Sequence, residues 1–413
     1  MNMAQRIVSL KVILIVVVLL FTFIMLLSPA LAYYPSMGDG EAKAKAVINI
    51  DEQLQRQLEK INLDGINTYL NHLDQEVGQY LPKISFQQVL DNVRQGKLPL
   101  DPGAAGRGLL KFLFHEIMVS GALLGQLIIL AVACAVLQNL QSAFSEGSIG
   151  TLARGIAFLA LITLALTSFT VAVRTGGEAI DQMVSFFQSI LPAMITLLAA
   201  TGGVTTSTLL QPVLIYAVTI IGTLMHNVLF PLLYLTAILT VVSHISDRFQ
   251  VSKLAGLLKQ AAMLGLGLIM TVFGGVLSIY GIAGSVADGV GLRAIEFATD
   301  ALLPVVGGML SEAVKTIAGT TLLLKSAVSL VGVIIIFFLA AFPMLKIFAL
   351  MMVYKVAAAV VQPFGEDQLA DSLDGISGAL TMVFACVAVT GLIFFLAIAV
   401  IVVLGNMTVA LRG

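Results

Sequence analysis

The sequence predicts an all-α, polytopic helical membrane protein with a small N-terminal exported helical segment, and two observations lead to this prediction. The chain of 413 residues is 59% hydrophobic and 11% charged, with a mean hydropathy of +1.02, whereas a soluble domain carries about 25% charged residues. Most of the chain after residue 116 consists of apolar runs of about 17–25 residues, the length that crosses a bilayer as a helix. A transmembrane β-barrel would instead show alternating segments of about ten residues.

The N-terminus has the pattern of a secretory signal. Two basic residues, Arg6 and Lys11, precede the apolar run 12–27, and residues 30–32 (Ala-Leu-Ala) form a small-x-small cleavage site. We therefore predict a signal peptide over residues 1–32. An uncleaved anchor helix is the alternative, and both interpretations export the residues that follow.

The exported segment, residues 33–115, is the one part of the chain with soluble character. Its apolar spacing predicts amphipathic helices near 54–61, 66–81 and 86–93, and the Pro- and Gly-containing stretch 99–108 predicts a linker into the membrane. Its acidic and basic residues are balanced, which gives no preference for nucleic acid. A helical segment of this size has a thin core, and we predict that it is a docking module.

The membrane part divides into first membrane helices (116–177) followed by two longer units. Two of its apolar segments, 186–200 and 301–311, are short and contain Leu-Pro. They predict either broken, re-entrant helices buried in protein or ordinary spans with a proline kink. The predicted apolar segments are 119–138, 155–173, 186–200, 209–227, 229–243, 261–284, 301–311, 320–341, 342–361 and 377–404.

Two Pro-containing pairs recur at a constant offset. Leu191-Pro192 recurs as Leu303-Pro304 and Phe230-Pro231 recurs as Phe342-Pro343, both 112 positions later. We predict an internal duplication of about 110 residues, with membrane repeat 1 at 178–285 and membrane repeat 2 at 290–404. Duplicated membrane units are typical of transporters, in which the two halves meet around a path or a midplane site. The four prolines are thus candidate kink positions.

The charges of the predicted loops do not give one orientation of the chain in the membrane. The loop at 244–260 is basic and is expected to be cytoplasmic. Its counterpart in the second unit, 362–376, is acidic. The opposite bias suggests inverted units, which need an odd number of spans, and the whole pattern is compatible with about seven to ten spans.

Ionisable residues inside apolar spans are candidate functional residues, because they are costly in lipid. Glu312 and Lys315 are spaced to pair on one helix face, and Lys355 lies deep in a predicted span. We expect Lys325 and Lys346 to reach the membrane surface by snorkelling. No acidic residue is expected in the core of a long span.

No pattern for catalysis, a cofactor or a metal occurs, and we predict that the protein is not an enzyme. His115-Glu116 begins like a zinc-protease motif, but Val119 occupies the position of the second histidine. Cys134 and Cys386 lie within apolar runs and are expected to pack as small apolar residues.

The second unit carries a resemblance to a known family. The run LLPVVGGMLSEAVKTIAGTTLLLKSAVSLVG, followed by AFPMLKIFALMMVYKVAAAVVQPFGEDQLADSLDGI, resembles stage III sporulation protein AE of endospore-forming Firmicutes. The resemblance covers about 45–405, includes the order of signal peptide and exported helical segment, and is most specific across 299–376.

This resemblance implies an integral membrane subunit of a mother-cell-to-forespore transenvelope channel. The implied partners are the other stage III A operon proteins, including ring subunits and a secretion-type ATPase, and a forespore membrane partner. The implied location is the mother-cell membrane around the forespore, and the implied role is a non-enzymatic pore, export gate or core scaffold for late forespore gene expression. From the residues alone, a self-sufficient secondary permease for a small metabolite is the alternative.

Overall fold

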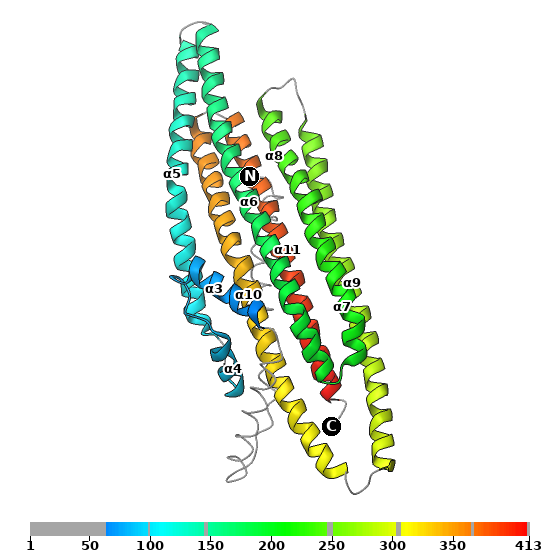
Figure 1. Cartoon of the computed structure of the whole chain (residues 1–413). Coiled ribbons are helices and arrows are strands. Elements are labelled where there is room, and N and C mark those ends of the chain that lie inside the picture. The colour runs from blue at the N-terminus through cyan, green and yellow to red at the C-terminus, as the bar shows by residue number, and fades with distance from the viewer. Residues whose placement is uncertain are drawn as a thin grey trace.

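The computed structural model describes residues 63–97, 100–143, 148–245, 251–302, 307–364 and 367–410 (Figure 1). Every regular element in these residues is a helix, which confirms the all-α class. The predicted signal peptide, the predicted helix at 54–61 and Pro304 lie outside the described residues.

The membrane part of the described residues forms a bundle of six long helical rods. One rod is compound, because α7 continues through the π-helix η1 into α8 without a break. The prediction of ten separate apolar segments was therefore wrong. The predicted segments 320–341 and 342–361, for example, belong to one helix. The elements are α5 (Pro102–Ala143), α6 (Ser148–Ala200), α7 (Val204–Leu224), η1 (Met225–Leu229), α8 (Phe230–Ile245), α9 (Ser252–Leu302), α10 (Gly307–Val361) and α11 (Asp367–Ala410). A short 3-10 turn, η2 (Gln362–Phe364), follows α10.

Each rod is longer than a bilayer is thick. Among the described residues, the six candidate spans are 36 to 45 residues long, which is about 54–68 Å at 1.5 Å per residue. The hydrocarbon core of a bilayer is about 30 Å thick, and an average tilt of about 20° shortens a helix's projection only slightly. Part of every rod therefore lies outside the hydrocarbon.

The helix ends show which segments share a side of the bundle. The C-terminal end of α8 and the N-terminal end of α9 lie at the same end of the bundle as the junction between α10 and α11 (Figure 1). The described helix ends that flank the loops at 244–260 and 362–376 are therefore on one side, and the expectation of inverted units is wrong. Acidic residues contribute little to membrane orientation, so the charge contrast between these loops carried no topological information.

The centre of the bundle is the hairpin of α10 and α11. The span windows of these two helices are 72% and 67% buried, against 22% for α5 and for α9. Close contacts across the hairpin depend on glycine: a Cβ added at Gly391 would lie 2.9 Å from the Cβ of Ala340. Small residues of this kind let helices approach closely in lipid.

The described helices of the predicted exported segment pack on this bundle and do not form a separate body. The predicted helix at 86–93 is confirmed as α4 (Phe86–Arg94), with Ser85 accepting a hydrogen bond from the Gln88 amide at 3.3 Å. The preceding helix, α3 (Asp64–Val77), lies against α6, where the rings of Tyr69 and Phe186 are 5.0 Å apart. Burial raises the pKa of the Tyr69 hydroxyl.

The predicted linker at 99–108 is wrong for most of its length, because α5 begins at Pro102. Asp101 is the N-cap residue, with its Oδ1 accepting a hydrogen bond from the Gly103 amide at 2.9 Å. Proline is favoured at the first position of a helix and Asp at the N-cap. Pro102, one of the residues that suggested a linker, therefore lies at the start of a helix.

Candidate functional site

Two of the four predicted kink prolines lie in the interior of an α-helix. Pro192 lies within α6 and Pro343 within α10. The re-entrant interpretation of 186–200 is therefore wrong: this segment is the end of one continuous 53-residue helix. The hydroxyl of Thr196 donates a hydrogen bond to the Pro192 carbonyl, one turn earlier in the same helix, at 2.8 Å.

The local structure at Pro231 differs from that at Pro192 and Pro343. It follows the π-helix η1, in which the Phe230 amide donates its hydrogen bond to the carbonyl of Met225, five residues earlier. Proline has no amide proton, and its ring crowds the carbonyl four residues before it. The wider π-turn relieves this crowding, and such turns occur frequently at functional sites. The predicted apolar segments 209–227 and 229–243 are therefore not separate, because α7, η1 and α8 form one rod.

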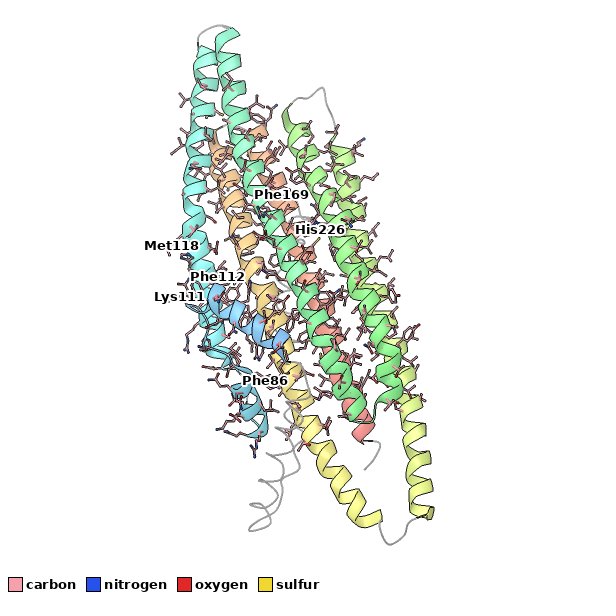
Figure 2. All side chains as sticks on the ribbon, viewed as in Figure 1. Phe86, Lys111, Phe112, Met118, Phe169 and His226 are labelled. Atoms are coloured by element: carbon pink, nitrogen blue, oxygen red, sulfur yellow. The ribbon has the colours of Figure 1, made fainter. Side chains whose placement is uncertain are left out.

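A cavity of about 580 Å³ lies between α6 and the η1–α8 segment at this level. Figure 2 shows His226 at mid-height of the bundle. The polar lining is Arg174, Glu178, Asp181, His226 and Tyr234, and Pro231 contributes to the apolar part. The α6 backbone comes close to α8 here, since a Cβ added at Gly177 would lie 3.5 Å from the Phe230 ring.

Three polar contacts organise the cavity. The Arg174 Nε donates to the Glu178 Oε1 at 2.8 Å. The His226 Nδ1 lies 3.9 Å from the Asp181 Oδ2, and this contact is an ion pair only when the imidazole is protonated. Above them on α6, the Thr170 hydroxyl lies 3.3 Å from the Tyr234 hydroxyl.

Two acidic residues lie in α6 at the point where the sequence was divided into two apolar segments. Glu178 and Asp181 both lie inside the candidate span Phe158–Ala200. The polar stretch around them interrupts the hydropathy of α6, and for this reason it was interpreted as a gap between two spans. Their side chains and those of Arg174 and His226 are more than half exposed, so the cluster faces outward from the chain. Such a cluster binds water and charged groups well and is unfavourable against lipid tails.

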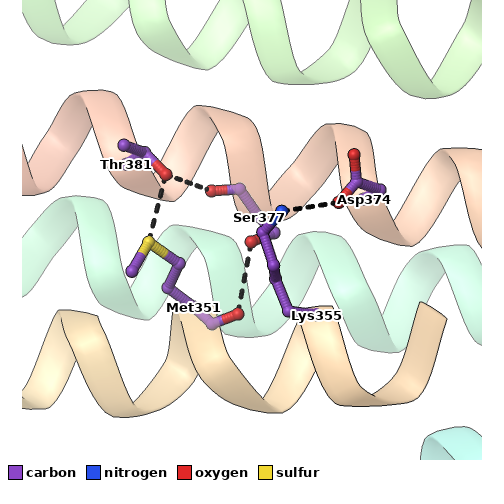
Figure 3. Close-up of polar contacts among 5 residues, drawn as sticks. All are labelled: Met351, Lys355, Asp374, Ser377 and Thr381. Carbon is purple, nitrogen blue, oxygen red and sulfur yellow. Dashed lines mark hydrogen bonds and ion pairs between the residues drawn. The ribbon is translucent and has the colours of Figure 1, made fainter. Parts of the chain in front are cut away.

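A second polar site joins α10 to α11 (Figure 3). The Lys355 Nζ lies 3.3 Å from the Asp374 Oδ1. One turn further along, the Ser377 hydroxyl donates to the Met351 carbonyl at 3.2 Å, and the Thr381 hydroxyl lies 3.0 Å from the Met351 sulfur. The depth of Lys355 is therefore explained by a partner, and the site ties the central hairpin together.

The other predicted charges do not join Lys355. Glu312 and Lys315 belong to α10, but their side chains lie outside the described residues. Glu312 is 43 positions before Lys355, which is about 65 Å along one helix. A single polar site containing both residues is therefore excluded.

The comparison with known proteins identifies the family. The model of the family "Stage III sporulation protein AE" matches residues 84–405. The chain belongs to the stage III sporulation protein AE family. A curated relative, stage III sporulation protein AE of Bacillus subtilis (strain 168), is 35% identical over 375 residues, which cover 91% of this chain and 94% of the relative. No solved structure matches the chain significantly.

Membership in the stage III sporulation protein AE family supports a role in sporulation, and the six candidate spans indicate a multi-pass membrane protein. The matched region runs from α4 to α11, so it contains the cavity and the Lys355–Asp374 pair. Among the described residues, no group of three His, Cys, Asp or Glu side chains is placed to hold a metal ion.

In this family member, two buried charges have partners that the sequence did not indicate. The snorkelling expectation for Lys325 is wrong: the side chain is 1% exposed and its Nζ donates to the Val402 carbonyl at 3.0 Å. Asp288 of α9 is also buried, and its two oxygens accept from the amides of Thr205 at 2.7 Å and Thr206 at 2.9 Å. Asp288 therefore caps the N-terminus of α7 from a neighbouring helix.

The only sequence signal for these contacts was the presence of a charged residue in or beside an apolar run. Lys325 and Asp288 find their partners 77 and 83 positions away. Such separations lie beyond any helical spacing rule, since the spacing of neighbours on one helix is three or four residues.

Proposed function

We propose that this protein is an integral membrane subunit of the channel that joins the mother cell to the forespore, in the mother-cell membrane around the forespore. It acts as a non-enzymatic pore, export gate or core scaffold of a secretion-like complex. Family membership supports the sporulation context. The channel role is supported by a bundle whose candidate spans, at 36 to 45 residues, exceed the thickness of a bilayer.

The length of the rods is the observation that carries the proposal. A protein that only moves a small solute across one bilayer has no need of helices about twice as long as the hydrocarbon is thick. A subunit that connects a membrane to an assembly beside it does. The exported helices support this picture, because α3 packs on the part of α6 around Phe186, and this part would then lie on the exported side.

The proposed partners are the ring subunits and the secretion-type ATPase of the stage III A operon, and a forespore membrane partner. Of the exported helices, α3 offers the docking surface for the ring subunits. Each buries an apolar face, and α3 turns polar side chains such as Asn67 and Asn71 outward. That exposed face is hydrated and accessible from the exported side.

The test is affinity purification of the tagged full chain from sporulating cells in mild detergent, with partners identified by mass spectrometry. We expect the ring subunits and the ATPase to be recovered. The variant Asn67→Arg/Asn71→Arg should lose the ring subunits at an unchanged protein level, because both changes are on the exposed face. A matched double change on the polar face of α4, Gln87→Arg/Gln88→Arg, shows whether added charge alone is responsible. Recovery of the chain without any of these partners would contradict the proposal.

A self-sufficient permease for a small metabolite is the second candidate, and the cavity favours it. A volume of about 580 Å³ with charged lining lies in the range of small-molecule sites, about 300–1,000 Å³. Under this alternative the protein purifies without ring subunits, and the Asn67→Arg/Asn71→Arg variant sporulates normally. The same purification therefore separates the two candidates.

A further inference from the structure

A stripe of polar side chains runs along the outer face of α6. Its exposed members are spaced three or four residues apart, and at 100° per residue they fall within an arc of about 80°. The stripe extends over 23 residues, from 163 to 185. Its ends are about 33 Å apart along the helix, which is close to the thickness of the hydrocarbon core. The α6 stripe consists of Thr163, Thr167, Thr170, Arg174, Glu178, Asp181 and Ser185.

The stripe has a second wall. The rod formed by α7, η1 and α8 runs antiparallel to α6, and two contacts fix the alignment: Thr170 with Tyr234 and Asp181 with His226. The cavity lies between these two contacts and opens outward. Polar groups from two different helices and a cavity thus coincide at the middle of the stripe.

The exposed surfaces of α9 and α5 include many large apolar side chains, although Lys111 and His115 are also exposed on α5. On α9, Leu264 is 72% exposed and Leu268 is 63% exposed, and on α5 Met118 is 73% exposed. These surfaces suit lipid tails, whereas Arg174, Glu178 and Asp181 do not. The molecule therefore has faces for lipid and one face that requires water.

We propose that the α6 stripe, together with His226 and Tyr234, forms one wall of a water-filled path that is closed by further copies of this chain. This inference rests on the proposed channel function and deepens it. Charge favours copies as the neighbours: Arg174 pairs with Glu178, and Asp181 has His226 beside it. The Arg174–Glu178 pair is neutral, so the wall carries one net negative charge when His226 is neutral. Identical walls with so little net charge repel one another little across water and salt, and closed rings of identical subunits are common.

The experiment is cysteine accessibility in the full chain in cell membranes, with a charged methanethiosulfonate reagent that does not cross lipid. The native Cys134 and Cys386, both buried, are first replaced by alanine. Single cysteines are then placed at Thr167, Glu178 and Ser185 of the stripe, and at Leu264 and Leu268 as controls of comparable exposure. We expect the stripe cysteines to react about tenfold faster or more, because lipid-facing thiols are shielded from the reagent and remain protonated.

Equal rates at the stripe and at the α9 controls would overturn the inference. So would reaction at Ser185 without reaction at Thr167, since the charges would then mark a membrane surface. Two differently tagged copies expressed together should purify as one assembly, and recovery of one tag alone would overturn closure by copies. A reactive stripe in a homo-oligomer that purifies without ring subunits would keep this inference and contradict the proposed function, so the two failures are distinguishable.

Discussion

The two Phe-Pro pairs of the chain have different structural outcomes. Phe342-Pro343 lies inside α10, which continues as an α-helix on both sides. Phe230-Pro231, 112 positions earlier, follows a π-helix and borders the polar cavity. The same dipeptide thus occurs once in the packed centre and once at an open, polar edge.

Packing explains the difference. Phe342 is buried between the ring of Phe112, 4.8 Å away, and that of Phe338, 5.8 Å away. The span window of α10 is 72% buried, whereas that of the α7–α8 rod is 33% buried. Neighbouring helices surround α10 and restrict its backbone. The α7–α8 rod has one open side, which leaves room for the wider π-turn. The α7–α8 rod at the edge is therefore suited to contact with water, and α10 in the centre is suited to stabilising the bundle.

The largest effect is expected in the centre. Lys325→Glu places a carboxylate against the Val402 carbonyl in a site that is 1% exposed, and an uncompensated buried charge costs about 3–5 kcal/mol. The loss should appear as a lower midpoint of thermal unfolding in detergent. Lys325→Met, which keeps the length of the side chain, is the control and should be far milder. Equal midpoints for both variants would contradict a central, water-free Lys325.

A smaller effect is expected at the edge of the bundle. Asp288→Ala removes both acceptors that cap α7, and loss of a helix cap costs about 0.5–2 kcal/mol. Asp288→Asn retains one acceptor and should lose less. Thermal unfolding of the two variants measures the difference, and a destabilisation by Asp288→Asn as large as that by Asp288→Ala would argue against capping.

The contacts between α10 and α11 should each contribute modestly. Ser377→Ala removes the hydrogen bond to the Met351 carbonyl, with an expected loss of about 1 kcal/mol. Lys355→Met breaks the half-exposed pair with Asp374, and such pairs contribute about 0.2–1 kcal/mol. Normal sporulation in both variants would agree with a structural site, and loss of sporulation at full protein level would give Lys355 a functional role.

The smallest change in stability is expected at the cavity, combined with the clearest loss of function. Glu178→Gln/Asp181→Asn changes only side chains that are more than half exposed, so the free energy of unfolding should change by about 0.5 kcal/mol or less. Sporulation frequency should nevertheless fall, because the wall of the path loses its charge. The double variant Thr271→Val/Ser278→Ala, at exposed positions of α9 outside both the cavity and the α6 stripe, is the matched control. Wild-type sporulation in the charge variant would show that sporulation does not need the charges of the cavity.

Composition and apolar run length were enough to predict the class and most of the helical residues, because a chain this apolar must bury or embed its surface. The number of rods was not predictable in the same way. The polar residues from Arg174 to Asp181 and the proline at 192 each resemble a break, yet α6 passes through both. The cavity was missed for the same reason, since its acidic residues were assigned to a gap.

The partners of the buried charges depend on packing between distant segments. Asp374 was part of an acidic stretch in the sequence, and only the α10–α11 hairpin brings it to Lys355. Asp101-Pro102, in contrast, is a local signal for the start of α5 that sequence rules do contain. The glycines around it outweighed that signal in the prediction.

Hydrogen exchange measured by mass spectrometry on the full chain in lipid nanodiscs tests the central contrast most directly. Peptides that cover 222–232 and 336–346 contain the two Phe-Pro pairs in edge and centre. We predict that amides of the first peptide exchange about tenfold faster or more than those of the second, because opening next to water is easier at the edge. Equal, slow exchange in both peptides would contradict a hydrated edge and a packed centre.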